Sequence, residues 1–309
     1  MGGGRFTPSD WGKYTDKTTK HAKTVDDIYT SRGINKDLNP HGVKIRESRD
    51  SDDNPNSNAV IVGLDVTGSM GMVLDVMARE AMKTLILEIY DRKPVSDPHV
   101  MIMGIGDVEC DSAPLQVTQF EADIRVAEQL TKIYLERGGG GNSYESYTFP
   151  WYFAAMHTSI DCFEKRGKKG YIFTVGDEEP TVILRKDDIL RFLGSGPEVD
   201  LDPQALLTMV SRNYDVFHVM VAEGSHMRHY KDRVIKKWSD LLGQRALLLN
   251  DHTKLSEVIV SAIQVNEGAK EEDVIASWDG STSVTVAEAI KGMSTSLTKS
   301  KAGEKVVML

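Results

Sequence analysis

The stretch that decides the fold reads Val60-Ile61-Val62-Gly63-Leu64-Asp65-Val66-Thr67-Gly68-Ser69-Met70-Gly71. It begins with an apolar run typical of a buried β-strand and then breaks into a turn. Asp65, Thr67 and Ser69 place oxygen atoms at alternate positions of that turn, and a segment with apolar residues at helical spacing follows at once. Because carboxylate and hydroxyl oxygens suit Mg²⁺ or Mn²⁺, this strand–turn–helix join predicts a divalent metal site.

The same residue types also serve other purposes. Asp, Thr, Gly and Ser are ordinary turn and helix-capping residues, so a plain turn remains the competing interpretation. A phosphate-binding P-loop requires Gly-x-x-x-x-Gly-Lys-Ser/Thr, and no Lys follows Gly68 or Gly71. Phosphotransferases of the haloacid-dehalogenase type carry Asp-x-Asp after the first strand, whereas the second position here is Thr67. Neither catalytic motif fits.

From residue 59 onward, strand patterns alternate with helix patterns. The expected strands are 59–65, 99–107, 115–118, 170–177, 214–222 and 245–250, and the expected helices are 70–92, 120–137, 144–165, 203–212, 229–242 and 253–265. Such alternation predicts an α/β fold, a doubly wound and mostly parallel sheet with helices on both faces. Only a short link separates strands 99–107 and 115–118, so we expect a hairpin and one antiparallel edge strand.

The flanking regions have a different composition. Residues 1–58 are expected to form a polar N-terminal extension and linker, because 46–58 is rich in Asp, Ser and Asn. Residues 59–265 would form the α/β domain, with an insertion at 184–199. Residues 266–309 would be a C-terminal tail with one weak helix, which begins at the capping box Thr285-x-x-Glu288.

Two further motifs fall where a doubly wound fold binds ligands, at the carboxyl ends of strands near the topological switch point. Asp177 follows the apolar strand 171–176 and would lie beside a solvent-facing Asp65 if the two strands are neighbours. Two such acids need a cation between them or a raised pKa. The glycine run 138–141 is either a hinge or a loop that approaches an ion closely. Asn142 and Ser143 then offer oxygen ligands, and the sequence does not choose between them.

The order Asp-x-Thr-Gly-Ser, then a glycine-rich polar loop, then a strand ending in Gly-Asp resembles the metal-ion-dependent adhesion site of von Willebrand factor A (vWA) domains. The resemblance covers about residues 59–265. The usual middle-loop ligand in that family is Thr, and this chain departs from it. It looks more like the intracellular bacterial and protist branch, which carries Gly-Gly-Gly-Asp-x-x-Glu; Asn142 then takes the Asp position and Glu145 matches the Glu.

The resemblance implies a metal-dependent adaptor rather than an enzyme. Mg²⁺ (or Mn²⁺) would be held directly by Thr67, Ser69 and either Asn142 or Ser143, with Asp65 and Asp177 binding directly or through water. The ion would accept an exposed Asp or Glu of a partner protein, and intracellular vWA proteins of this kind often serve AAA+ ATPases of the MoxR type. The alternatives are a structural assembly protein braced by the metal and a divalent-metal phosphohydrolase. The hydrolase would need a cationic phosphate clamp, and in the sequence only Arg137 lies near the three site segments.

Composition excludes several other classes. A formal net charge of −9 and a pI near 5.4 argue against nucleic acid as the main partner, because neutralising phosphates needs a basic surface. No apolar run reaches eighteen residues and the N-terminus has no signal-peptide core, so we expect no membrane span and no export. Two cysteines do not make a disulfide framework and are expected to be reduced thiols in a cytoplasmic protein.

Overall fold

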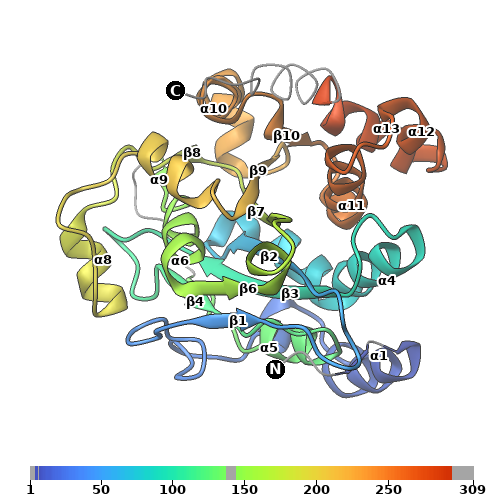
Figure 1. Ribbon diagram of the computed structural model, residues 1–309, viewed down its shortest axis with the longest axis horizontal. Helices are drawn as coiled ribbons and strands as arrows, with labels where there is room; N and C mark the ends of the chain where they lie inside the picture. The colour runs from blue at the N-terminus through green and yellow to red at the C-terminus, as the bar shows by residue number, and fades with distance from the viewer. Residues whose placement is uncertain (1–3, 6, 137–143, 294–309) are drawn as a thin grey trace.

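The structure is a computed structural model that describes residues 4–5, 7–136 and 144–293 (Figure 1). Its strands in chain order are β1 Arg46–Ser48, β2 Asn58–Asp65, β3 Pro98–Ile105, β4 Leu115–Val117, β5 Tyr144–Glu145, β6 Thr158–Ile160, β7 Gly170–Gly176, β8 Glu179–Pro180, β9 Tyr214–Val221 and β10 Ala246–Leu249. Six of them form the central sheet, and the pairs β1–β6 and β5–β8 form two small parallel sheets.

The α-helices are α1 Pro8–Tyr14, α2 Val25–Ile28, α3 Gly71–Val76, α4 Met82–Arg92, α5 Arg125–Leu130, α6 Phe149–His157, α7 Asp161–Glu164, α8 Lys186–Leu193, α9 Pro203–Val210, α10 Ser225–Leu242, α11 Leu255–Asn266, α12 Glu271–Ala276 and α13 Gly280–Ile290. Short 3₁₀ or π turns, η1 Thr15–Thr19, η2 Gly68–Met70, η3 Met77–Ala81, η4 Gly243–Arg245 and η5 His252–Lys254, adjoin several of them. In the described part of the chain, none of the helices is long and apolar enough to cross a membrane.

The strand order of the central sheet is β10-β9-β7-β2-β3-β4. All neighbours are parallel except β3 and β4, which are antiparallel. The chain runs from β2 outward through β3 to the β4 edge, and then returns to the other side of β2 at β7. The carboxyl ends of β2 and β7 therefore flank the topological switch point. The expected doubly wound, mostly parallel sheet with one antiparallel edge strand is confirmed.

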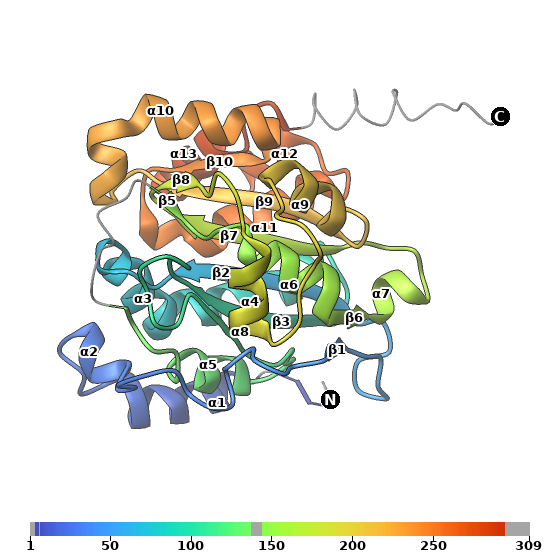
Figure 2. The ribbon, with the colours of Figure 1, turned by 90° about the vertical axis from the view of Figure 1, so that its left-hand side faces the viewer.

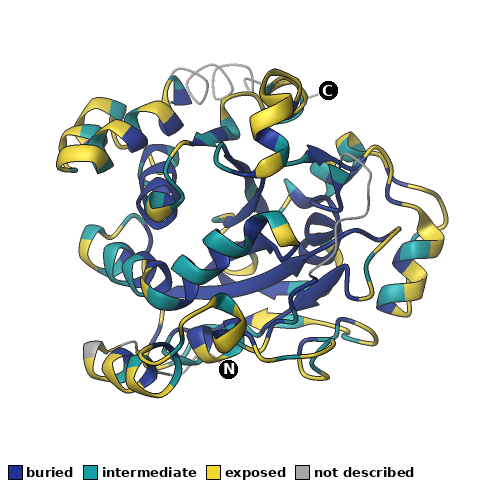
Figure 3. Cartoon of the chain, turned by 180° about the vertical axis from the view of Figure 1, so that it is seen from behind, coloured by how far each residue is buried: buried dark blue, intermediate teal, exposed yellow. Residues whose placement is uncertain are grey.

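Alternation along the strands builds a separate core on each face of the sheet. Val60, Val62 and Leu64 of β2 face one core, whereas Ala59 and Ile61 face the other. Helices α4 and α11 cover the first face and α6 and α9 cover the second (Figure 1). Seen from behind, the buried strands lie between helices with exposed outer surfaces (Figure 3). Full burial of one such aliphatic side chain stabilises the fold by about 1.5–3 kcal/mol. All eight residues of β2 are buried, as expected for a strand in the interior of the sheet.

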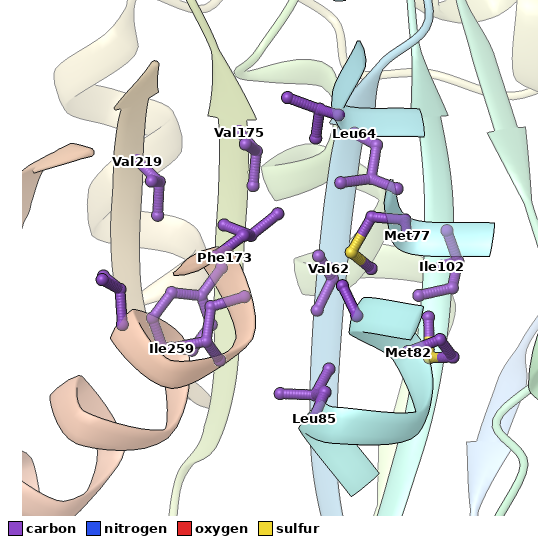
Figure 4. Packing of buried hydrophobic residues seen from close by; sticks show 14 of the residues in the cluster. Val62, Leu64, Met77, Met82, Leu85, Ile102, Phe173, Val175, Val219 and Ile259 are labelled. Atoms are coloured by element: carbon purple, nitrogen blue, oxygen red, sulfur yellow. The ribbon is translucent and has the colours of Figure 1, made fainter. Parts of the chain in front are cut away.

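The first core is shown close up in Figure 4. Val62 of β2 and Phe173 of β7 point from the sheet toward Met77 and Leu85 of the helical segment after β2, and toward Ile259 of α11. This segment matches the expected helix 70–92, although η3 inserts a π turn between α3 and α4. The packing fixes the turn between β2 and α3 against the sheet.

Two expected helices are much shorter in the structure. Of the described residues 120–136, only Arg125–Leu130 form an α-helix, because the Gln116 side chain binds the backbone of the segment that follows. Its Nε2 donates to the Tyr134 carbonyl at 2.7 Å, and its Oε1 accepts from the Tyr134 N–H at 2.8 Å. The expected helix 144–165 is divided into β5, α6, β6 and α7, because 158–160 pairs with β1 instead of continuing the helix.

The insertion and the tail carry more structure than the sequence predicts. The segment 184–199 contains α8, and its ends are joined by a bridge between Leu184 and Leu201. In the tail, α12 and α13 pack against the first core through Val274, Val286 and Ile290. The predicted helix start at Thr285 is wrong: α13 begins at Gly280, and the Thr285 hydroxyl donates to the Ser281 carbonyl one turn earlier.

The N-terminal extension also packs against the first core. Trp11, Tyr14 and Tyr29 are buried there. The Tyr14 hydroxyl donates to the Ala78 carbonyl at 3.1 Å, and the Tyr29 hydroxyl donates to the Leu74 carbonyl at 3.0 Å. The extension then runs past α5 toward β1 (Figure 2). The domain boundaries at 58 and 265 remain a prediction, but side chains on both sides of each boundary share one core.

Candidate metal centre

Asp65 and Asp177 lie at the carboxyl ends of the two strands that flank the switch point. Asp65 is the last residue of β2, and Asp177 directly follows β7. The two strands are hydrogen-bonded in parallel, with Leu64 opposite Val175. The structure thus brings the two acids together as expected. The expectation that Asp65 faces solvent is wrong, since both side chains are completely buried.

The Asp65 carboxylate is held by three donors. Its Oδ1 accepts from the Thr67 N–H at 2.9 Å and from the Thr67 hydroxyl at 2.6 Å, and its Oδ2 accepts from the Tyr147 hydroxyl at 2.8 Å. Burial raises the pKa of Asp65 to about 6, and the Asp177 charge adds to the rise, although the three hydrogen bonds oppose it. This carboxylate is therefore costly to ionise without a compensating cation.

Asp177 is bound by the other side of the same turn and by the start of α10. The Ser69 hydroxyl donates to its Oδ1 at 3.0 Å, and the His226 N–H donates to its Oδ2 at 2.9 Å. Gly224 precedes α10, and a Cβ at that position would lie 2.2 Å from the Cβ of Asp177. A glycine is thus required for the backbone to come this close to the acid.

Two more acids surround the pair and lack partners for one oxygen each. Within the described residues, Oε2 of Glu145 and Oε2 of Glu178 are buried without a hydrogen-bond partner. Burial, followed by the Asp65 charge, raises the pKa of Glu145 to about 11 and that of Glu178 to about 8. The acidic turn after β3 adds to both shifts through Asp107. Buried carboxylates in such number need protons or a cation.

The donor set fits a hard divalent cation. Asp65, Asp177, Glu145 and Glu178 offer carboxylate oxygens, and no sulfur ligand or imidazole takes part in the contacts described above. The hydroxyls of Thr67 and Ser69 give their protons to the two aspartates, which leaves their oxygen lone pairs free to bind a metal. Both the charge and the ligand chemistry suit Mg²⁺ or Mn²⁺, so the metal-ligand roles predicted from the sequence remain consistent but stay predictions.

The middle-loop segment is described from Tyr144 onward. Asn142 and Ser143 lie outside the described residues, so the choice between them stays open. The chain is described again from β5, which pairs with β8 just after Asp177, with Tyr144 opposite Glu179. Glu145, the residue that matched the family's Glu, is therefore beside the strand end that carries Asp177.

Several residues at the centre were not predicted from the sequence. Tyr147 is fully buried, and its hydroxyl lies where a Cβ of residue 176 would be, so Gly176 makes room for it. Two cationic side chains of α10 also lie near the site segments, because Arg233 and Lys237 both form ion pairs with Glu179, two residues after Asp177. The expectation that only Arg137 lies near the site segments is therefore wrong. Nothing local in the sequence indicates these contacts, because α10 is distant along the chain.

A second group of possible ligands lies at the carboxyl ends of β9 and β10. Oxygen or nitrogen atoms of Glu223, Asp251 and His252 lie within 4.8 Å of one another. The Glu223 carboxylate already accepts from the His252 N–H and lies 2.7 Å from its Nδ1. Asp251 accepts from the N–H and hydroxyl of Thr253, at 3.0 and 2.6 Å. These hydrogen bonds explain why the three side chains lie close together without a metal ion. The Asp251–Thr253 turn repeats the Asp65–Thr67 turn, but the acid beside it, Glu223, is only half-buried.

The strand order and the mostly parallel pairing define the class of fold: a doubly wound α/β sheet of the vWA- or Rossmann-like kind. No family model and no curated protein matches the sequence. Among solved structures, a von Willebrand factor type A from Catenulispora acidiphila is similar at 12% identity and a TM-score of 0.39, over 69% of this chain and 43% of that one.

The pilus adhesin SpaC from Lactobacillus rhamnosus GG in its open conformation is similar at 9% identity and a TM-score of 0.44, over 73% of this chain and 30% of that one. A second form of SpaC gives 10% identity and a TM-score of 0.43, over 73% and 31%. The alignment thus spans less than half the length of each of these proteins.

Proposed function

We propose that this protein is a metal-dependent protein-binding module, whose bound Mg²⁺ or Mn²⁺ accepts a carboxylate from a partner protein. The observation that supports it most is the pair of fully buried strand-end acids, Asp65 and Asp177, each hydrogen-bonded to a hydroxyl of the same turn. Burial without a cation is unfavourable for two such carboxylates. A divalent ion would relieve that cost and give the turn a binding role.

The residues of the chain would divide the work as follows. Thr67 and Ser69 would bind the ion through their hydroxyl oxygens while they donate protons to Asp65 and Asp177. Asn142 or Ser143 would supply a third neutral ligand. Tyr147 orients Asp65 from beneath, and the backbone at His226 orients Asp177. Glu145 and Glu178 would balance the charge of the ion from a second layer.

The ion would supply an exchangeable coordination position, since Mg²⁺ retains water ligands that a carboxylate can replace. A partner Asp or Glu would then form a charge-assisted contact in a partly desolvated site. Ser69 is half-buried and Gly68 is exposed, so the turn is open to such an approach. An AAA+ ATPase of the MoxR type is the candidate partner that the family resemblance implies.

The proposal is tested by binding in the presence and absence of the metal. Proteins captured on the immobilised chain in Mg²⁺ would be eluted with denaturant, which releases metal-dependent and metal-independent partners alike, and then identified, purified and titrated against wild type, Asp65→Asn and Asp251→Asn. Asp251→Asn is the matched control, because it alters the same Asp-x-Thr turn at a different strand end. We expect binding to wild type and to the control only in Mg²⁺. A partner that binds equally in chelator and to Asp65→Asn would refute the proposal.

One observation favours a second function, a divalent-metal phosphohydrolase. Arg233 and Lys237 place two cations beside the site, as a phosphate clamp would require. Both are already paired with the buried Glu179, which reduces the charge available to a substrate. Metal-dependent release of phosphate from nucleotides or phosphoesters, abolished in Asp65→Asn, would favour the hydrolase. A fold-bracing metal would instead be indicated by unfolding in chelator without any partner.

A further inference from the structure

A cavity of about 580 Å³ lies between the N-terminal extension and α5, away from the candidate metal centre. One wall is formed by residues 36–39, 41–43 and 46, and the other by Arg125, Glu128, Gln129 and Lys132; Gln119 also lines the cavity. This volume falls within the range of small-molecule sites. The extension passes α5 at this place in Figure 2.

The wall formed by the extension is anchored at three points. The Val117 N–H donates to the Leu38 carbonyl at 2.8 Å, and the Gly42 N–H donates to the Leu193 carbonyl at 2.9 Å. The His157 Nδ1 lies 2.9 Å from the Val43 carbonyl. Because these anchors hold the extension to β4, α8 and α6, the cavity is part of the fold rather than a gap beside a loose segment.

Arg46 lines this cavity and is incompletely paired. Its Nη2 donates to the Asp37 carbonyl at 3.1 Å, but its Nε–H is buried and has no hydrogen-bond partner among the described residues. Arg49, three residues further on, makes ion pairs with Glu47, Asp161 and Glu164. Burial lowers the pKa of Arg46, although the nearby Asp37 charge partly offsets this. Arg46 is half-buried as a residue, and a guanidinium with an unused donor favours a bound anion.

The other lining residues favour a small anion. The lining includes four cationic residues and two acids, a net formal charge of +2 in a protein of net charge −9: Lys36, Arg46, Arg125 and Lys132 against Asp37 and Glu128. Arg125 is held by Glu121 and Asp123, so Lys36 and Lys132, both exposed, are the cations at the rim. No Phe, Tyr or Trp among the described residues lines the cavity, which disfavours an aromatic ligand such as a nucleobase.

We propose that this cavity binds a small, non-aromatic organic oxyanion, whose charged group accepts a hydrogen bond from the Arg46 guanidinium. The oxyanion is a phosphate ester or a carboxylate, since the guanidinium fork binds either. The rim lysines add long-range attraction, and the Asn39 and Gln119 side chains offer polar contacts to hydroxyl groups of the ligand. The site is independent of the divalent metal and of the partner proposed above.

The test titrates glycerol 3-phosphate, citrate and, for comparison, chloride at constant ionic strength, in chelator, by calorimetry and thermal unfolding. Glycerol 3-phosphate represents phosphate esters and citrate represents carboxylates, so the two arms identify the class. We expect saturable binding of one of them to wild type and to Lys44→Ala, an exposed-lysine control on the same segment that does not line the cavity.

Arg46→Gln should weaken this binding about tenfold to a hundredfold, because a charge-assisted hydrogen bond is lost. Lys132→Gln, at the exposed rim, should weaken it about two- to fivefold without affecting the fold. If Arg46→Gln fails to fold, the double variant Lys36→Gln/Lys132→Gln still decides. Equal saturable binding by the substituted and wild-type proteins, or no saturable binding of either anion to wild type at millimolar concentration, would overturn the proposal.

Discussion

Replacing Asp65 by Asn should stabilise the metal-free protein and at the same time abolish its response to Mg²⁺. Burial raises the pKa of Asp65 from 3.8 to about 6. At roughly 1.4 kcal/mol per pKa unit, ionising this carboxylate at pH 8 costs the fold about 3 kcal/mol. Asn has the same shape and carries no charge, and its Oδ1 can still accept from Thr67. Its amide nitrogen cannot accept from the Tyr147 hydroxyl, which offsets about 1 kcal/mol.

The net expectation in chelator is a gain of about 2 kcal/mol in the free energy of unfolding, measured by urea denaturation at pH 8. In Mg²⁺ at a hundredfold excess over its Kd, wild type should gain about 2.7 kcal/mol while the variant gains nothing. The order of stability thus reverses between the two buffers. Asp251→Asn, which alters the equivalent turn, should respond to Mg²⁺ as wild type does. An Asp65→Asn protein that is destabilised in chelator and still stabilised by Mg²⁺ would refute the reasoning.

Three further predictions follow from the same site. The folded-state pKa values of Asp65 and Glu178, about 6 and about 8, lie above the ordinary values of these carboxyl groups, so their contribution to stability is complete below about pH 4 and is lost as pH rises through 6 and 8. The free energy of unfolding in chelator should therefore fall between pH 5 and 9, and saturating Mg²⁺ should flatten that slope. A free energy of unfolding that rises over this range would contradict the prediction. Gly224→Ala should remove Mg²⁺ binding in calorimetry and destabilise the protein by about 1–3 kcal/mol, because the new Cβ would lie 2.2 Å from the Asp177 Cβ. An unchanged Mg²⁺ affinity would show that Asp177 is not part of the site. Asn142→Asp should tighten divalent binding if Asn142 is the middle-loop ligand, whereas Ser143→Ala should weaken it if Ser143 is; calorimetry of both variants decides, and no effect of either would remove the glycine loop from the site.

The sheet could be predicted because its strands are buried on both faces. The expected strands 59–65 and 170–177 agree with β2 and β7 to within one residue at each end, since central parallel strands read as continuous apolar runs. The predicted extents of helices 120–137 and 144–165 were wrong, because residues outside these segments determine their backbone structure. The Gln116 side chain of β4 binds the backbone of the first segment, and β1 pairs with part of the second. The local spacing of apolar residues does not indicate either contact.

Some features of the candidate metal centre could also be predicted from the sequence, and others could not. The proximity of Asp65, Thr67, Ser69 and Asp177 could be predicted because the Asp-x-Thr-x-Ser spacing is local and both acids lie at the ends of strands that meet at the switch point. The complete burial of Asp65 could not be anticipated. It depends on Tyr147, whose hydroxyl reaches the carboxylate only because Gly176 leaves room beneath it. The cations of α10 beside Glu179 depend on how that helix packs against β8.

The most direct test of the central claim is a Mn²⁺ titration of the purified chain, followed by electron paramagnetic resonance. Mn²⁺ takes the same oxygen ligands as Mg²⁺, and its spectrum separates free from bound ion. The account predicts one saturable site in wild type and in Asp251→Asn, weaker binding in Thr67→Ala and Ser69→Ala, and none in Asp65→Asn. Absence of a saturable site in wild type, or equal binding by Asp65→Asn, would contradict it.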